Sequence, residues 1–162
     1  MEHLLNNATW APTHGNTQPW RFKVYMGESR SKLSDKLGEL YKKLTPKELF
    51  KDEKFEKIIA RPFLSSVSIV ICMERGGNEK IPEIEEVEAV ACAVQNICLT
   101  ATAYGIGSFW SSPKVIYDNE MNTFLKLKEK DKCLGILYLG YPSIDWPKGQ
   151  RKPIEYLTDW NE

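Results

Sequence analysis

The 162-residue sequence predicts an α+β domain in which a few buried strands are flanked by amphipathic helices. Two runs, 66–73 and 133–141, are almost wholly apolar, which is typical of strands buried on both faces. A third segment, 85–104, repeats its apolar residues at helical spacing and has few charges. We expect the strands and this helix to form the core of one domain spanning residues 1–162, since no linker, repeat or low-complexity tract interrupts the chain.

The charge balance excludes several classes of partner. Lysine plus arginine number 22 and aspartate plus glutamate number 22, so the net charge is zero. A nucleic-acid or anionic-membrane partner would require a basic face. No apolar run is long enough to span a bilayer, and the N-terminus lacks a signal-peptide pattern. We therefore expect a cytoplasmic protein that binds neither nucleic acid nor membrane.

The cysteines and histidines do not form a metal-ligand pattern. The four cysteines lie among apolar neighbours, and none belongs to a Cys-x-x-Cys pair (Cys72, Cys92, Cys98 and Cys133). Buried, reduced thiols are the favoured interpretation. Since His3 and His14 are the only histidines, we expect no metal site.

In the first half of the chain, residues 2–10 have helical spacing and 19–26 form a predicted strand. Ser29 is a candidate cap for a helix over 29–44. The sequence Thr45-Pro46-Lys47-Glu48 is typical of a capping box, which predicts a further helix ending before Pro62.

In the second half, a loose acidic segment is expected from Gly76 to about Glu86. After the helix over 85–104, residues 108–113 form a predicted short strand that turns into a loop, and 119–127 a helix. The 85–104 helix is apolar nearly all round, so it is either a central core helix or part of a subunit interface.

The most polar short stretch lies between two tryptophans, Trp10 and Trp20. Two prolines stiffen it, and a single glycine interrupts a series of amides and hydroxyls (Pro12, Thr13, His14, Gly15, Asn16, Thr17, Gln18 and Pro19). Such a loop is suited to holding the polar edge of a flat ligand. The alternative is a turn whose side chains merely bond nearby backbone.

Taken together, these motifs resemble the nitroreductase-like family of FMN-dependent oxidoreductases. The matching segments occur in the family's order and cover nearly the whole chain: 10–22, 91–96, 100–107, Trp110-Ser111-Ser112-Pro113, Leu139-Gly140-Tyr141-Pro142 and Arg151-Lys152-Pro153. The resemblance implies a central, mostly antiparallel sheet, with the long apolar helix at a homodimer interface. It also implies two FMN sites at that interface, where the Pro12–Gln18 loop of one subunit meets the flavin held mainly by the other.

The resemblance also implies roles for individual residues. Pro12, Thr13, His14, Asn16 and Gln18 would face the flavin, whose pyrimidine edge offers a donor and several acceptors. Trp110, Ser111 and Ser112 would contact the flavin through backbone and hydroxyl groups, while Arg151 and Lys152 would bind the phosphate. Oriented donors or a nearby cation would stabilise the charge of reduced flavin.

The implied reaction is ping-pong: NADH or NADPH reduces FMN, then a nitroaromatic, quinone or similar electron-poor acceptor is reduced. Because the cofactor carries the chemistry, no catalytic residue is strictly required. His14 is the one candidate for a proton or hydrogen-bond donor, although it could equally pack against or bond the dimer partner. The sequence does not indicate the physiological acceptor or the preferred nicotinamide.

One departure from the family pattern bears on cofactor binding. Members usually begin with a basic, serine-containing segment that grips the FMN phosphate and ribose, whereas Met1 here lies within the helix that follows it. The chain is then either a shortened member or one that binds flavin with fewer phosphate ligands. This leaves two alternatives to a reductase: a flavin-binding or non-enzymatic dimer, and a same-fold protein that cleaves flavin or removes halogens, with 74–86 as its only candidate lid.

Overall fold

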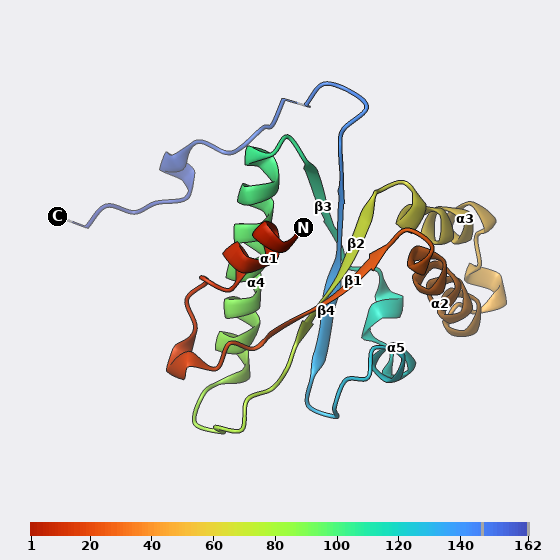
Figure 1. Ribbon diagram of the computed structural model, residues 1–162, viewed down its shortest axis with the longest axis horizontal. Coiled ribbons are helices and arrows are strands. Elements are labelled where there is room, and N and C mark those ends of the chain that lie inside the picture. The colour runs from red at the N-terminus through yellow and green to blue at the C-terminus, as the bar shows by residue number, and fades with distance from the viewer. Residues whose placement is uncertain (147, 162) are drawn as a thin grey trace.

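A computed structural model describes residues 1–146 and 148–161 and confirms an α+β architecture (Figure 1). Four strands form one antiparallel sheet in the order β1-β2-β4-β3. Their bounds are β1 Trp20–Met26, β2 Val67–Met73, β3 Gly107–Ser111 and β4 Lys132–Gly140. Every residue of β2 is buried, as its apolar run predicts.

One face of the sheet is covered by α4 (Glu83–Ala103), and α1 (Glu2–Ala8) packs on α4 (Figure 1). The core on this side contains Ile69, Ile71 and Met73 from alternate positions of β2. Polar bonds connect the two helices: Asn96 Nδ2 donates to the Asn7 carbonyl at 3.1 Å.

The other face carries α2 (Ser29–Leu44), α3 (Asp52–Ala60) and α5 (Asn119–Phe124) (Figure 1). Val70 and Cys72 of β2 point into this second core, together with the apolar stripe of α2. The two cores explain why the central strands are apolar on both faces.

The helix expected after Thr45 ends before Pro62 as predicted, but it begins only at Asp52, so the predicted start at Thr45 is wrong. Thr45 and Pro46 are extended, one 3₁₀ turn covers Lys47–Leu49, and the chain is extended again before α3 begins at Asp52. Thr45 provides no side-chain cap. The ring of Phe50 packs on Tyr41 instead, with centroids 5.1 Å apart, and this contact competes with a continuous helix.

Two smaller expectations also differ from the structure. Ser29 does not cap α2; it is the first helical residue, and its hydroxyl donates to the Met26 carbonyl at 2.7 Å. The segment after β2 is not loose at its ends. Arg75 Nη1 lies 2.5 Å from Oε2 of Glu86, which is 1% exposed, and Arg75 Nη2 donates to the Ile81 carbonyl at 2.6 Å.

Helix α4 is not buried all round by its own chain. Its sheet-facing residues are fully buried, but Ile84 and Leu99 are 60% and 61% exposed, and Tyr104 just beyond the helix is 51% exposed. The interpretation of α4 as a core helix therefore accounts for only one side of it.

All four cysteines are free thiols; Cys72 and Cys133 are buried, whereas Cys92 and Cys98 are only half-buried. The described residues contain no cluster of three or more His, Cys, Asp or Glu side chains suited to a metal ion. No helix in the described part of the chain has the length and apolarity to cross a membrane.

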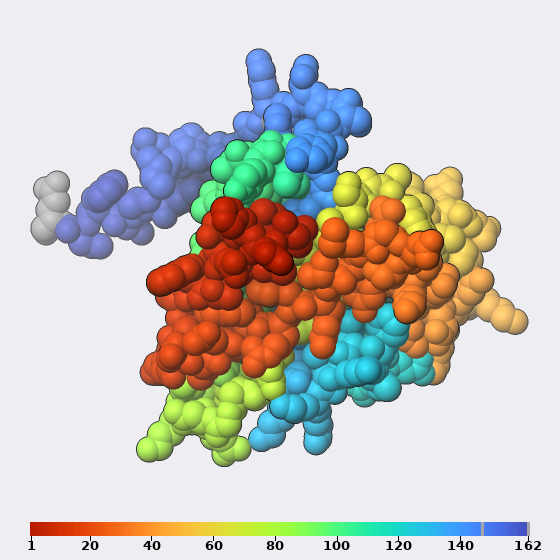
Figure 2. Space-filling model, in the orientation of Figure 1, coloured from red at the N-terminus to blue at the C-terminus, as the bar shows by residue number. Residues whose placement is uncertain are grey.

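The C-terminal arm, residues 148–161, stands away from the body of the molecule (Figure 2). Every residue in it is exposed except Thr158, which is half-buried. Its hydrogen bonds are local, such as that from Tyr156 N to the Pro153 carbonyl. The arm passes near the C-terminal end of α4 (Figure 1).

Candidate functional site

The loop from Pro12 to Gln18 forms a turn at the end of the molecule where α4 begins (Figure 1). Three of its residues have positive φ: Gly15 at 58°, Asn16 at 54° and Gln18 at 45°. Positive φ is costly for residues other than glycine and tends to occur at functional sites. A Cβ on Gly15 would also lie 2.9 Å from the Ile81 side chain, so this position favours glycine.

The polar groups of the loop divide into two sets. Thr13 Oγ1 lies 3.0 Å from Thr17 Oγ1 and accepts from the Gln18 backbone N–H at 3.2 Å, so this hydroxyl serves the turn itself. The exposed Asn16 and Gln18 side chains bond each other, with Gln18 Nε2 donating to Asn16 Oδ1 at 3.0 Å. The turn interpretation therefore describes Thr13, whereas the amides of Asn16 and Gln18 face solvent and can meet a ligand.

His14 is positioned by α4. Its Nδ1 lies 2.5 Å from Oε2 of Glu85, in the first turn of that helix. Because Nδ1 is engaged, Nε2 is the ring nitrogen left to face outward. No local pattern in the sequence indicates this pair, because the two residues lie 71 positions apart in the chain.

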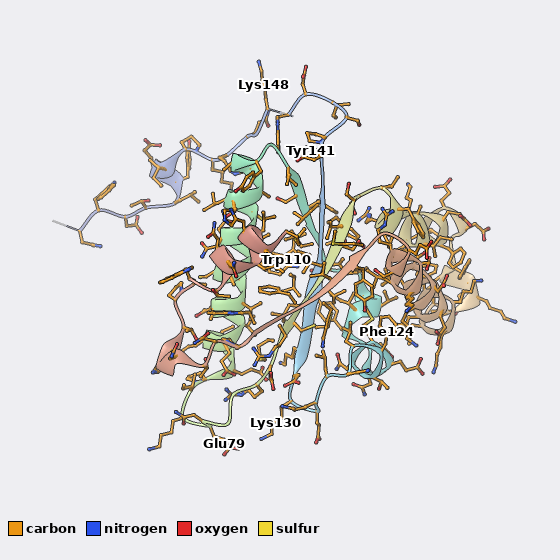
Figure 3. The ribbon with its side chains drawn as sticks, viewed as in Figure 1. Glu79, Trp110, Phe124, Lys130, Tyr141 and Lys148 are labelled. Atoms are coloured by element: carbon orange, nitrogen blue, oxygen red, sulfur yellow. The ribbon has the colours of Figure 1, made fainter. Side chains whose placement is uncertain are left out.

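Trp110 and Ser111 point to opposite faces of the sheet, as neighbouring strand residues must. Trp110 lies on the α4 side (Figure 3), against Gly135, where φ is 150° and an added Cβ would overlap the indole. Ser111 points to the other side, where its Oγ accepts from Arg61 Nη1 at 3.2 Å. Ser112 Oγ donates to the Leu134 carbonyl at 3.4 Å.

Arg61 lies beside the predicted site residue Ser111 and is a candidate that the sequence patterns did not suggest. Its guanidinium lies over the Phe109 ring, 5.2 Å from the centroid, as well as beside Ser111. A cavity of about 190 Å³, here called the Arg61 cavity, opens beside it; Lys54, Lys57, Ser111 and Tyr138 are among its lining residues. No carboxylate lines this cavity in the described part of the chain, so its electrostatic character is cationic.

Tyr138 connects the Arg61 cavity with a second cavity of about 440 Å³ along the start of β3. The Tyr138 side chain is buried, and burial raises the pKa of its hydroxyl to about 12, although Arg61 opposes the shift. The hydroxyl is thus protonated at neutral pH and can donate a hydrogen bond into the cavities.

The predicted phosphate ligands, Arg151 and Lys152, lie on the exposed C-terminal arm. Within one chain the structure does not bring them to the Pro12–Gln18 loop, because the arm and the loop lie near opposite ends of α4 (Figure 1). The 21 residues of α4 correspond to a length of about 30 Å. The predicted site residues therefore form separate groups on a single chain.

The chain matches the model of the Nitroreductase family over residues 1–141. It belongs to the nitroreductase family. This membership confirms the resemblance seen in the sequence motifs. A relative of Escherichia coli (strain K12) named "Putative NAD(P)H nitroreductase YdjA" is 28% identical over 144 residues, which cover 89% of this chain and 76% of the relative.

Solved structures of other nitroreductase-fold proteins support the same fold. A nitroreductase-like family protein from Bacillus cereus is 30% identical with a TM-score of 0.81, and the match covers 99% of this chain and 83% of that one. The FMN-dependent nitroreductase NfnB from Mycobacterium smegmatis, solved with NADPH, has a TM-score of 0.77 at 16% identity, covering 100% of this chain and 87% of that one. At such low identity the second likeness shows the fold alone.

Proposed function

We propose that this nitroreductase family member is an FMN-dependent oxidoreductase that uses NADH or NADPH to reduce nitroaromatics, quinones or similar electron-poor acceptors in a ping-pong mechanism. The observation that carries the proposal is the pairing of Ser111, a predicted flavin contact, with the Arg61 guanidinium at 3.2 Å, beside a cavity that no carboxylate of the described residues lines. A positively charged donor such as the Arg61 guanidinium suits FMN, because the reduced form of FMN is anionic.

FMN, when bound, supplies the hydride chemistry. The chain's own task is to bind and orient it. Arg61 and Lys57 would place positive charge beside the Ser111 loop, and the Tyr138 hydroxyl would offer a neutral donor. His14 would present Nε2 as a hydrogen-bond or proton donor, because Glu85 engages Nδ1.

We further propose that the working unit is a homodimer with its FMN sites at the interface. The outer surface of α1 and α4 exposes Trp10 (84%) and Leu99 (61%), which together with Asn7, Asn96 and Thr100 surround a shallow cavity. Exposed apolar groups gathered in this way are typical of an interface. In a dimer, the Pro12–Gln18 loop of one copy can approach the β3 loop and arm of the other, which would assemble the groups that one chain keeps apart.

The first test is a visible absorption spectrum of the protein after adding FMN and desalting, followed by anaerobic addition of NADH or NADPH. Retained flavin that is bleached by either nucleotide, and reoxidised by a quinone or nitroaromatic, is the expected result. Retained flavin that neither nucleotide bleaches would favour the flavin-binding alternative without turnover. No retained flavin would favour a non-enzymatic dimer.

Two variants test the assigned roles. Arg151→Ala should weaken FMN binding about tenfold if Arg151 holds the phosphate, whereas Lys148→Ala on the same arm should not. Arg61→Gln should make the midpoint potential of bound FMN more negative by about 30 mV, corresponding to roughly 1.4 kcal/mol for two electrons. An unchanged potential would remove Arg61 from the flavin site; Lys47→Gln, on the exposed 3₁₀ turn, is the control.

A further inference from the structure

We propose that a further pocket, on the side of the sheet opposite α4, binds a small aromatic carboxylate. This pocket, here called the Lys54 pocket, has a volume of about 280 Å³. It lies between the connection from α2 to α3 on one side and the segment 113–115 on the other. The proposal does not depend on the proposed reductase function.

The pocket is bordered by the broken helical segment after Thr45. The chain leaves α2 in an extended conformation at Thr45 and Pro46, makes one 3₁₀ turn, and is extended again at Phe50 and Lys51. A continuous helix would carry these residues along a different path. Thr45, Pro46 and Leu49 instead line the wall of the pocket.

The walls of the Lys54 pocket are mainly apolar. Tyr41, Leu44, Leu49, Ile58, Pro113 and Val115 contribute to them. Leu49 is 64% exposed and Leu44 is 42% exposed, so this chain leaves part of the apolar surface open to solvent. A volume slightly below the usual range for ligand pockets suits a ligand of about one ring rather than a dinucleotide.

The charged groups of the pocket are all cations. Lys54 and Lys114 line it, no carboxylate does, and within the described residues neither ammonium group makes an ion pair. The nearby Lys36 and Lys43, by contrast, both pair with Glu120. The Lys54 ammonium lies 5.8 Å from the centroid of the Tyr41 ring, which places positive charge against an aromatic wall.

This combination selects the chemical class of the ligand. Apolar walls favour a hydrophobic body, and two unpaired ammonium groups favour an anionic head. Inorganic phosphate would satisfy the lysines but would place polar oxygens against Leu44 and Leu49 without hydrogen-bond partners. A neutral aromatic alcohol would satisfy the walls but leave the lysines without a counter-ion.

The pocket adjoins the candidate flavin site. Lys54, Ile58 and Pro113 line both the Lys54 pocket and the Arg61 cavity. Leu49 and Val115 line the Lys54 pocket but not the Arg61 cavity, and Ser111 lines the Arg61 cavity but not the Lys54 pocket. These residues therefore report separately on the two sites.

The test is a titration of the FMN-supplemented protein with sodium benzoate. The NMR signals of the Leu49 and Val115 methyl groups are the readout. Saturable shifts of both methyl groups are expected. Lys54→Gln and Lys114→Gln should each weaken binding about three- to fivefold, as expected for one exposed charge pair. Lys51→Gln, an exposed neighbour that does not line the pocket, should leave it unchanged.

Several results would overturn the proposal. The proposal is contradicted if the methyl groups of Leu49 and Val115 do not respond to benzoate. It is also contradicted if both lysine variants bind benzoate as tightly as the parent protein. Benzyl alcohol binding as tightly as benzoate would exclude a role for the charge. Inorganic phosphate displacing benzoate with equal affinity would reduce the pocket to a general anion site.

Discussion

His14 and Glu85 lie 71 residues apart in the sequence, yet His14 Nδ1 and Glu85 Oε2 are 2.5 Å apart in the structure. The pair fastens the Pro12–Gln18 loop to the first turn of α4. If the loop faces flavin as proposed, it would thereby be oriented by the helix that we propose to lie at a dimer interface.

Replacing Glu85 with alanine should loosen the loop without unfolding the protein. The pair is partly exposed, so its contribution is about 0.2–1 kcal/mol. Amide hydrogen exchange at Thr17 and Gln18 should therefore rise by roughly two- to fivefold, while exchange in β2 should not change. Glu88→Ala, on an exposed position of α4, is the matched control. Equal exchange in the two variants would show that the pair does not order the loop.

The buried pair of Arg75 and Glu86 should contribute much more. Glu86 is 1% exposed, and it also accepts from the Gly76 backbone N–H at 3.0 Å. Glu86→Ala would leave the Arg75 guanidinium largely buried without its counter-ion, which costs about 3–5 kcal/mol of unfolding free energy. Urea denaturation measures this loss. Glu83→Ala, which removes a surface pair with Lys132, should cost less than about 1 kcal/mol. Equal losses of unfolding free energy in the Glu86 and Glu83 variants would contradict the larger contribution of the buried pair.

Gly135→Ala should destabilise the sheet beside β3. The residue has φ of 150°, and an added Cβ would overlap the Trp110 indole, so both backbone and packing must adjust. We expect a loss of roughly 2–3 kcal/mol in urea unfolding, together with a change in tryptophan fluorescence. A Cβ on Gly77 would meet nothing within 4 Å, so Gly77→Ala should stay within about 0.5 kcal/mol of the parent. A tolerated Gly135→Ala would show that Trp110 moves freely.

Glu74 should make stability depend on acid pH. A hydrogen bond from Lys128, with help from Arg21, lowers the pKa of the Glu74 carboxyl below its ordinary value of 4.5. The charged form is thus favoured by folding, and its contribution is present above pH 4.5 and lost as the pH falls through the folded-state pKa. Glu74→Gln should therefore cost up to about 1 kcal/mol at pH 7 and progressively less below pH 4.5. A difference that persists at pH 3, measured by urea unfolding, would refute this.

The sequence predicts the elements with strong periodicity well. Strands β1, β2 and β4 begin and end within a residue or so of the predicted ranges, because apolar runs of that length have few other ways to be buried. The predicted α+β class is confirmed for the same reason. Helix α4 begins two residues earlier than expected, directly after Pro82.

Contacts between distant segments were beyond the reach of local patterns. The capping-box signature at Thr45 failed because tertiary packing of Phe50 on Tyr41 determines the path of the chain there. Arg61 was missed because its relation to Ser111, 50 residues later, is set by the fold. The roles of the predicted site residues toward flavin stay predictions. The structure shows which of their polar atoms are exposed to solvent and could contact a ligand.

The exposed arm would make the affinity for the cofactor depend on the concentration of the protein. Arg151 and Lys152 lie on a segment that is exposed almost throughout. Ordering that segment therefore costs conformational entropy. If association with a second copy supplies the compensating contacts, cofactor affinity and self-association are thermodynamically linked. Flavin would then be lost on dilution, and added flavin would draw dilute chains together.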